Sequence, residues 1–537
     1  MYTKKITALG AVLILGNAVL VANLAFYMKN SAYLQTASQQ NQLTVTAGSV
    51  EGTIYDRNLQ PLVNQDSSYY AFVNPTPDSI TALLPHVREI MPILEALQDP
   101  DAEPFCCEVD TTEIPDPDIT ILEVPVRYSE NSIAPHVIGY TLEHTGITGL
   151  ESDFDEILRQ EEDLISVSYT VDAVRQILPG VEPVISPAEY KNPGIVTTLD
   201  RDIQAICEAQ AIEKGAIVVM DVHSGDVLAM ASFPDYAPDA IGDALSNPDS
   251  PLINRCLYAY NVGSIFKLMT CAAAYTQNLQ DFTAECTGST QIRKQIFRCH
   301  DLSGHGELTM KDAMIQSCNT YFVELSQLLQ SALMRETAQD FGFGRQIVLS
   351  RSIVSSSGTL PGIKDLALPA EMANFCFGQG LLTATPLQVT QMTCGIANNG
   401  NMPLARLVRG IINNNNNNNN LIQDERSPMY ARAIKRNAAY YLRDMMVSAI
   451  NENPNSNAIP ETVFAAAKTS TAQTGRYDED GQELCHAWIT GYFPIDNPEY
   501  AVTVLVEDGG YGNTAAAPVF KEIADSITEL TTVPQAE

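Results

Sequence analysis

Apolar residues follow three different patterns along the chain, and each pattern predicts a different kind of structure. The first is an apolar run from Ile6 to Met28, about the length of one membrane-spanning helix. The second, from about Asn30 to Lys191, alternates short strand-like runs with turns rich in Pro and Asp. The third begins near Pro193, where longer apolar runs appear. We therefore expect three parts: a cytoplasmic tip and anchor at 1–28, an elongated extracytoplasmic pedestal at 29–191, and a larger domain at 192–537.

The first apolar run allows two interpretations. Lys4 and Lys5 precede it and would hold its start on the cytoplasmic side, which leaves the rest of the chain outside. A cleaved signal peptide is the rival interpretation, but the run is long for such a peptide and no clear small-x-small site follows it. We therefore expect a single-pass protein of the cell membrane with an extracytoplasmic catalytic domain.

The region after Pro193 has the signals of an α/β domain. Ile195 to Leu199 is typical of a strand, and Asp200 can cap a helix that begins at Arg201. Ala216 to Met220 and Val227 to Ser232 are apolar runs around a Gly-containing turn, which predicts a β-hairpin buried on both faces.

Helical patterns fill the middle of this region, and strands return at its end. One helix is predicted from near Leu308 through Val323, and Thr385-Pro386-Leu387-Gln388 has the cap, proline and capping box of a structural helix start. Strands first, helices next and strands again predict one sheet shared by both ends of the domain. The late strand candidates are Val463 to Thr471, Ala487 to Phe493 and Tyr500 to Glu507, and a helix from Ala516 to Leu530 closes the chain.

Composition narrows the function classes. The chain has 537 residues and a formal net charge of -33, which excludes nucleic acid as a partner because phosphate binding needs a basic surface. The hydrophobic fraction of 45% indicates globular domains. The asparagine run from Asn413 to Asn420 has no apolar content and predicts a solvated, mobile loop.

Cysteines are too sparse for a disulfide scaffold, because there are only 11 of them in the chain. Several lie in apolar runs and are expected to be small buried hydrophobic residues: Cys207, Cys271, Cys376 and Cys394. Cys286 and Cys299 bracket a polar segment and form a disulfide candidate if the domain lies outside the cytosol. No C-x-x-C pair or zinc-type spacing occurs, so we expect no metal and no cofactor.

The candidate chemistry begins at Gly263-Ser264-Ile265-Phe266-Lys267. The lysine follows the serine by three positions, at the start of an apolar run, which puts hydroxyl and ammonium one helical turn apart. A lysine desolvated at a helix start can serve as the base that a serine nucleophile needs. A serine cap with a surface lysine is the alternative interpretation of this pattern taken alone.

Two further motifs follow in order, Ser317-x-Asn319 and Lys468-Thr469-Ser470-Thr471. Together the three motifs resemble those of the penicillin-recognising serine acyltransferases, and with the anchor and pedestal the chain resembles a class B penicillin-binding protein of the penicillin-binding protein 2 and FtsI type. The resemblance covers roughly residues 48–530 and is weakest before Pro193. It implies a serine β-lactamase-like α/β domain, with a central antiparallel sheet flanked by helices, after an α+β pedestal.

The resemblance also implies a role for each motif residue. Ser264 would be the acylated nucleophile, Lys267 its base, Ser317 a proton relay and Asn319 a holder of Lys267 and the substrate amide. The backbone N–H groups of Ser264 and Thr471 would form the oxyanion hole. The substrate carboxylate would be bound by Lys468, Thr469, Ser470 and Thr471. Ser470 stands where the family usually has glycine, and it could either crowd the site or be tolerated without consequence.

The reaction implied is D,D-transpeptidation of peptidoglycan stem peptides that end in D-Ala-D-Ala, with β-lactams as covalent inhibitors. A D,D-carboxypeptidase or β-lactamase, in which water resolves the same acyl-enzyme, is one alternative. A β-lactam sensor or an inactive cell-wall scaffold is another. No glycosyltransferase domain is apparent, so a membrane glycosyltransferase is the expected partner. Division, elongation and sporulation all remain open as roles in cell shape and cell-wall growth.

Overall fold

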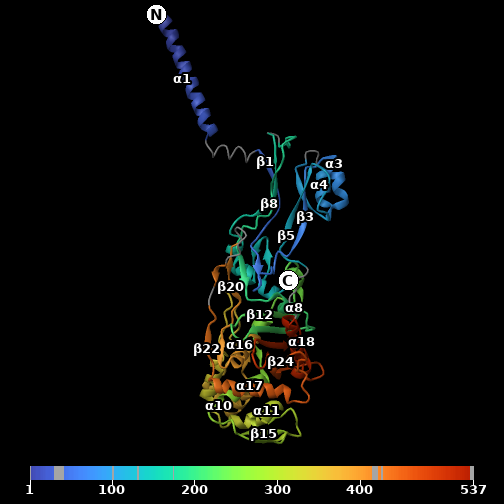
Figure 1. Cartoon of the computed structure of the whole chain (residues 1–537), viewed down its shortest axis with the longest axis vertical. Helices are drawn as coiled ribbons and strands as arrows, with labels where there is room; N and C mark the ends of the chain where they lie inside the picture. The colour runs from blue at the N-terminus through green and yellow to red at the C-terminus, as the bar shows by residue number, and fades with distance from the viewer. Residues whose placement is uncertain are drawn as a thin grey trace. The chain divides into compact units, whose positions relative to one another are not determined.

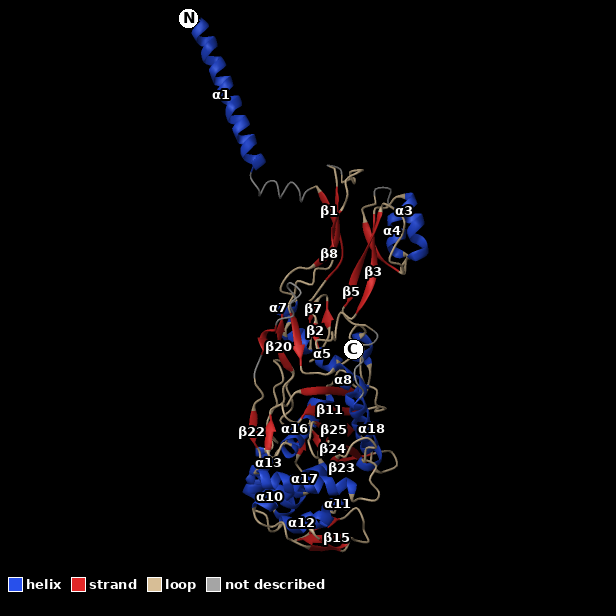
Figure 2. Cartoon of the chain, in the orientation of Figure 1, coloured by secondary structure: helices blue, strands red, loops and turns tan. Residues whose placement is uncertain are grey.

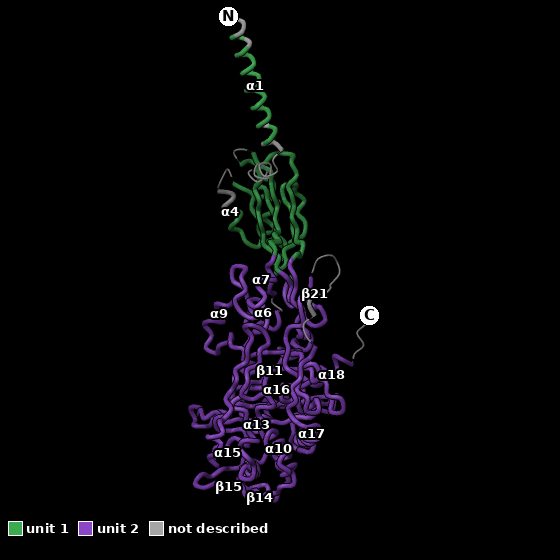
Figure 3. Tube along the Cα trace, turned by 90° about the vertical axis from the view of Figure 1, so that its left-hand side faces the viewer, with its two compact units in different colours: residues 1–51, 66–126, 161–191 green, residues 52–65, 127–160, 192–537 purple. Residues whose placement is uncertain are grey.

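The computed structural model describes residues 2–29, 41–98, 102–129, 132–172, 175–413, 421–424 and 427–532. The described chain forms two compact units (Figure 3): unit 1 comprises residues 1–51, 66–126 and 161–191, and unit 2 comprises 52–65, 127–160 and 192–537. The expected pedestal, 29–191, is thus divided between them, because 52–65 and 127–160 pack with the larger unit. Apart from Asn413, the asparagine run predicted as a loop lies outside the described residues.

Unit 1 contains helix α1 (Tyr2–Lys29) and two small antiparallel sheets of three strands each (Figures 1 and 2). Within the described part of the chain, no helix meets both the length and the hydropathy required to cross a membrane. One sheet has the order β1-β8-β9 and the other β4-β3-β5. The elements of these sheets and their helices are β1 (Gln42–Ser49), β3 (Asp66–Val73), α3 (Pro77–Leu83), η1 (Leu84–His86), α4 (Met91–Gln98), β4 (Phe105–Val109), β5 (Ile119–Val126), β8 (Leu164–Thr170) and β9 (Val184–Ser186).

Unit 2 is organised around a five-stranded antiparallel sheet of order β12-β11-β25-β24-β23. Strands from the beginning and the end of the domain therefore share one sheet, as the sequence predicts. The predicted hairpin forms β11 (Gly215–Asp221) and β12 (Val227–Phe233), and nearly all of its residues are buried. The three late strands form β23 (Ala466–Tyr477), β24 (Glu483–Phe493) and β25 (Tyr500–Val506).

Helices cover both faces of this sheet, because side chains along each strand alternate between two cores. Ile217 and Val219 of β11 belong to a core shared with α8 (Arg201–Glu208) and α18 (Gly512–Thr532). Val218 and Met220 belong instead to the core that contains α16 (Pro386–Ala397) and α10 (Lys267–Thr276). The sheet is the middle layer of three, which explains why β11 and β12 are buried on both faces.

Both predicted helix caps are confirmed. Asp200 accepts a hydrogen bond from the N–H of Ile203 at the start of α8. Thr385 and Gln388 form the capping box of α16, with Pro386 at its first position.

The single helix predicted from Leu308 through Val323 is wrong. The structure has two helices there, α11 (Met310–Ile315) and α12 (Asn319–Ser326). They are separated at Ser317, which adopts a left-handed backbone conformation with φ of 49°. That conformation ends a helix, so the break puts the Ser317-x-Asn319 motif at a helix start.

The remaining elements of unit 2 surround this sheet. They are β2 (Ile54–Tyr55), α5 (Pro135–Ile138), β6 (Thr141–Leu142), β7 (Thr145–Gly146), α6 (Gly149–Asp153), α7 (Asp155–Leu158), β10 (Gly194–Thr197), α9 (Ile241–Ser246), η2 (Arg255–Leu257), β13 (Tyr260–Asn261), η3 (Gly263–Phe266), β14 (Ala284–Cys286), β15 (Ser289–Ile292), β16 (Gln295–Arg298), β17 (Gly306–Leu308), α13 (Ser331–Asp340), α14 (Ile363–Leu366), α15 (Pro369–Cys376), β18 (Thr383–Ala384), β19 (Asn401–Pro403), β20 (Val408–Ile412), β21 (Leu421–Asp424), β22 (Tyr430–Arg432) and α17 (Arg436–Asn451).

Candidate active site

Ser264 lies on a tight 3-10 turn, η3, that runs directly into helix α10. Gly263 begins this turn with φ of 62°, a conformation that favours glycine, and its N–H donates to the carbonyl of Gly378 at 2.9 Å. The apolar residues of α10 are buried and fix the helix in the core. The Ser264 side chain is partly exposed, and its hydroxyl has no hydrogen-bond partner among the described residues. The turn therefore leaves the Ser264 hydroxyl available to a substrate, while the buried helix α10 holds the backbone in place.

Lys267 is fully buried at the first position of α10. Its ammonium donates to the Ser317 carbonyl at 2.7 Å and to Asn319 Oδ1 at 2.8 Å, and it lies 3.4 Å from Ser317 Oγ. Two of the three sequence motifs therefore meet at one nitrogen atom. Burial lowers the pKa of Lys267 to about 8, so a neutral amine is accessible near physiological pH.

Lys468 brings the third motif to the same place. Its ammonium is buried, donates to Ser317 Oγ at 3.1 Å and to the carbonyl of Thr469 at 2.8 Å. Burial, together with the nearby charge of Lys267, lowers the pKa of Lys468 to about 7. The Ser317 hydroxyl is consequently shared by two lysines, which suits a group that passes protons.

Strand β23, which carries this third motif, is the edge strand of the sheet. Its open edge lies beside η3, because a Cβ atom added at Gly263 would be 3.1 Å from Ala472 Cα. An unpaired strand edge next to the first turn of a helix offers backbone N–H groups from both sides. Thr471 Oγ1 accepts from the N–H of Gly512 at 3.2 Å, which holds its hydroxyl.

Ser470 points in a different direction from its two threonine neighbours, since side chains alternate along a strand. It is buried, and its hydroxyl donates to the carbonyl of Val262 at 2.8 Å. The side chain therefore contacts the backbone that leads to Ser264.

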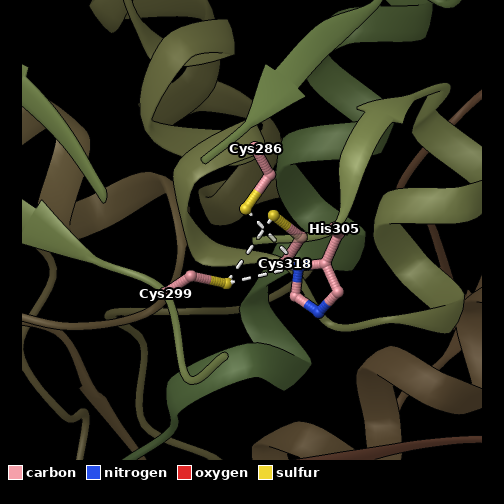
Figure 4. Close-up of side chains that lie close together, drawn as sticks. All are labelled: Cys286, Cys299, His305 and Cys318. Atoms are coloured by element: carbon pink, nitrogen blue, oxygen red, sulfur yellow. Dashed lines mark hydrogen bonds between the residues drawn. The ribbon is translucent and has the colours of Figure 1, made fainter. Parts of the chain in front are cut away.

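Near the Ser317-x-Asn319 motif, four side chains converge that the sequence does not place together. Figure 4 shows Cys286, Cys299, His305 and Cys318 pointing toward one another, and their ligand atoms all lie within 4.8 Å. Cys286 and Cys299 are free thiols, so the disulfide expected between them is absent from the structure. The physical reason is that each sulfur faces His305 at a hydrogen-bond distance, 3.4 Å from Cys286 and 3.6 Å from Cys299.

A further contact joins two members of this group, since the sulfurs of Cys299 and Cys318 are 3.8 Å apart. The hydrogen bond between them lowers the pKa of Cys299 and raises the pKa of Cys318.

The comparisons with known proteins agree with this fold. The family described as "Penicillin binding protein transpeptidase domain" matches residues 215–525, and the chain belongs to this family. The fold and the three assembled motifs therefore define a penicillin-recognising transpeptidase domain.

Two curated relatives are similar to the chain. It is 27% identical to the Stage V sporulation protein D of Bacillus subtilis, over 78% of this chain and 66% of that protein. It is 29% identical to the peptidoglycan D,D-transpeptidase MrdA of Haemophilus influenzae, over 61% of this chain and 55% of that protein. The matches thus span less than two thirds of either relative.

One solved structure resembles nearly the whole chain. It is described as "Structural coordination of polymerization and crosslinking by a peptidoglycan synthase complex" and has a TM-score of 0.71 at 22% identity. It covers 98% of this chain and 99% of the other, so the likeness in fold extends to both units.

The sequence motifs found the residues that meet around Ser317, but they missed His305 and Cys318 as members of a cysteine cluster. Cys318 is the middle residue of the Ser317-x-Asn319 motif, and its spacing to the other cysteines is not that of a known zinc motif. A search for cysteines and histidines spread between Cys286 and Cys318, without requiring a C-x-x-C pair, would have found the group.

Proposed function

We propose that the chain is a serine D,D-transpeptidase that cross-links peptidoglycan stem peptides. The observation that carries the proposal is the convergence of Lys267 and Lys468 on Ser317. Lys267 lies one helical turn from Ser264, whose hydroxyl has no hydrogen-bond partner among the described residues. The MrdA relative of Haemophilus influenzae is named for the same reaction, as a peptidoglycan D,D-transpeptidase.

The first step is acylation. The neutral amine of Lys267 takes the proton of the Ser264 hydroxyl, and the oxygen attacks the carbonyl carbon between the two D-alanines. The negative charge on the carbonyl oxygen is stabilised by the N–H groups of Ser264 and Thr471. Lys468, with hydroxyl groups of its strand, binds the terminal carboxylate as a cation.

The second step releases the leaving group and forms the cross-link. As the C–N bond breaks, a proton passes from Lys267 through the Ser317 hydroxyl to the nitrogen of the departing D-alanine. An amine from a neighbouring stem peptide then attacks the acyl-enzyme, loses its proton to the same base, and displaces Ser264. Asn319 holds Lys267 in place throughout, through the 2.8 Å hydrogen bond to its amide oxygen.

Covalent inhibition by β-lactams follows from the same chemistry. A β-lactam offers a strained amide beside a carboxylate, so it meets the same nucleophile and the same cation. After ring opening the amine cannot leave, and the acyl-enzyme persists.

Membrane anchoring and a polymerase partner are further parts of the proposal. The apolar sequence of α1 and the exposure of large side chains such as Leu15 and Ile14 support an N-terminal anchor, with the rest of the chain extracytoplasmic. The fold neighbour comes from a complex described as joining polymerization and crosslinking, which supports a membrane glycosyltransferase as partner. Membrane fractionation of the full chain, compared with a chain that lacks residues 1–29, tests the anchor.

The reaction is tested with a synthetic donor that ends in D-Ala-D-Ala and an acceptor that carries a free amine. The proposal predicts a cross-linked product and one free D-alanine per cross-link. Free D-alanine with only hydrolysed donor would indicate a carboxypeptidase instead. No product of either kind, under conditions where the protein still binds penicillin, would contradict the assigned reaction.

A further inference from the structure

The group formed by Cys286, Cys299, His305 and Cys318, here called the cysteine cluster, does not have the geometry of a disulfide. A disulfide requires a sulfur–sulfur distance of about 2.0 Å. The Cys299 and Cys318 sulfurs are instead 3.8 Å apart, and the sulfurs of Cys286 and Cys299 lie 3.4 Å and 3.6 Å from His305 Nδ1.

These spacings fit a tetrahedral metal site. Zinc binds thiolate sulfur at about 2.3 Å and imidazole nitrogen at about 2.0 Å, so the edges of its tetrahedron measure about 3.5 to 3.8 Å. Three cysteines and one histidine are a common set of ligands for structural zinc, and soft sulfur ligands favour zinc over magnesium or calcium.

The local backbone supports a site that is formed in advance. Cys286 ends β14 and His305 precedes β17, which pairs with β14, and the His305 N–H donates to the Cys286 carbonyl at 3.0 Å. Gly304 makes this approach possible, because its φ is 84° and an added Cβ would lie 2.3 Å from the Cys286 carbonyl oxygen. All three cysteines of the cluster are buried, which protects their sulfurs from solvent.

We propose that the cysteine cluster binds one zinc ion, in place of the disulfide and the absence of metal expected from the sequence. As the ion binds, the three thiols release their protons to solvent and three sulfur–zinc bonds form. His305 completes the tetrahedron as a neutral imidazole. Because four protein ligands fill the coordination sphere, the ion is structural and does not touch the substrate.

The site also positions the active centre, a step that rests on the proposed transpeptidase function. Cys318 lies between Ser317 and Asn319, the two residues that hold the Lys267 ammonium. Ser317 has a left-handed backbone that is unfavourable for a side chain, so this turn requires support from its surroundings. A bond between zinc and the Cys318 sulfur holds the turn at Ser317 in place, because Cys318 is the next residue of the chain.

The first test measures metal content in the detergent-solubilised full chain, purified without a histidine tag. Elemental analysis is expected to find about one zinc per chain. Cys318→Ser and His305→Ala are expected to lose most of it. His300→Ala and Cys106→Ser are matched controls, since His300 neighbours Cys299 but lies outside the cluster and Cys106 lies in unit 1; both should retain zinc.

A second measurement uses the unmodified chain, so it does not depend on whether the variants fold. Replacing zinc by cobalt in the unmodified chain should give the intense sulfur-to-metal absorption of tetrahedral thiolate cobalt. Less than about 0.2 zinc per chain after equilibration with equimolar zinc would overturn the proposal. A Cys286–Cys299 disulfide found by peptide mapping of the purified protein would overturn it as well.

The effect of zinc on the active centre is measured separately, through the rate of acylation. Removing zinc with a chelator should slow acylation by a fluorescent penicillin by about tenfold or more, and added zinc should restore it. Ser264→Ala should retain zinc while it loses acylation, so failure of the metal site and failure of the catalytic proposal are distinguishable. Equal acylation rates with and without zinc would refute the positioning role.

A separate observation concerns Ser470, whose hydroxyl donates to the carbonyl of Val262 at 2.8 Å. Val262 immediately precedes Gly263, and an added Cβ at Gly263 would lie 2.4 Å from Ser470 Oγ. The Ser470 hydroxyl therefore occupies the space next to Val262 and Gly263, where the turn that carries Ser264 begins. We infer that Ser470 is a positioning residue that holds the turn carrying Ser264.

This inference is the opposite of the expectation that Ser470 crowds the site. A serine that only crowded the site would slow acylation, so its removal would make acylation faster. Ser470→Gly and Ser470→Ala should each lower the acylation rate constant about tenfold, with the dissociation constant of the initial penicillin complex unchanged. If Ser470 only stabilised the fold, the two variants would have a lower melting temperature. They would not combine a slower acylation rate constant with an unchanged dissociation constant. An unchanged or faster rate in both variants, or a change in binding alone, would overturn the inference.

Discussion

The amide oxygen of Asn319 lies 2.8 Å from the ammonium nitrogen of Lys267, although 51 intervening positions separate the two residues along the chain. This contact joins the first residue of α10, three positions after Ser264, to the first residue of α12, two positions after Ser317. It makes the protonation of Lys267 depend on the residue at position 319. The first prediction uses that dependence.

At saturating penicillin, acylation should become faster as pH rises through about 8, because Lys267 acts as a base only in its neutral form and its pKa is lowered to about 8 by burial. The pKa of Lys468 is lowered to about 7 in the free protein, but a carboxylate bound beside it favours its charged form, so the prediction is for the penicillin complex. Asn319→Asp places a carboxylate beside the ammonium, which favours the charged form and should move the midpoint of the profile to higher pH. Rates of acylation by a fluorescent penicillin, measured between pH 6 and pH 10, give the midpoint. Asn319→Ala is the control, because it removes the amide without adding charge; an equal upward shift in both variants would contradict the electrostatic explanation.

Lys267→Arg should lose acylation at every pH in this range. The guanidinium keeps a positive charge and similar length, but it cannot give up its proton. Loss of a positioned base is worth roughly a factor of 10² to 10⁴ in rate. If a neutral amine were unnecessary and only the charge mattered, the variant would retain acylation within a few-fold of the original.

Gly263→Ala should disrupt the nucleophile turn, because the position has φ of 62° and the new methyl group would meet Ser470 Oγ at 2.4 Å. Combining Gly263→Ala with Ser470→Gly removes this clash but leaves the backbone strain. The double variant should therefore recover part of the lost stability, with a coupling energy of about 0.5 to 3 kcal/mol. Chemical denaturation of the four proteins measures this cycle, and strictly additive effects would show that the two residues do not interact.

Arg255→Met should destabilise unit 2 by about 3 to 5 kcal/mol, because it leaves the Glu507 carboxylate buried without a cation, with the neutral Tyr260 hydroxyl still donating to it. The Arg255 and Glu507 side chains are 3% and 14% exposed, and their charged atoms lie 2.8 Å apart. Lys521→Ala breaks two more exposed pairs, one with Glu461 and one with Asp525, and should cost only about 0.2 to 1 kcal/mol for each pair. Thermal unfolding of both variants tests the contrast, and similar losses in the two would refute it.

Much of the fold could be predicted because local signals and tertiary packing agree. The buried hairpin of β11 and β12, the caps at Asp200 and Thr385, and the sheet shared by both ends of unit 2 all follow from runs of a few residues. The helix expected to pass through Ser317 failed because its apolar spacing continues across a residue whose backbone is left-handed. Hydrophobic periodicity does not record such a conformation.

The site shows the same division. Ser264 and Lys267 could be related by their spacing, since residues three apart lie on one face of a helix. The other motif residues were assigned through their resemblance to the motifs of the family. The cysteine cluster could not be predicted, because its members come from two hairpins and a helix start that meet only in the folded domain. Ser470 was recognised as unusual, but its contact with the Val262 carbonyl depends on which face of β23 meets η3.

Intact-protein mass spectrometry after incubation with penicillin G tests the central claim most directly. The account predicts one covalent adduct per chain that persists for hours, maps to Ser264 after digestion, and is absent from Ser264→Ala. A folded protein that forms no adduct, or whose adduct maps to any residue other than Ser264, would contradict the account.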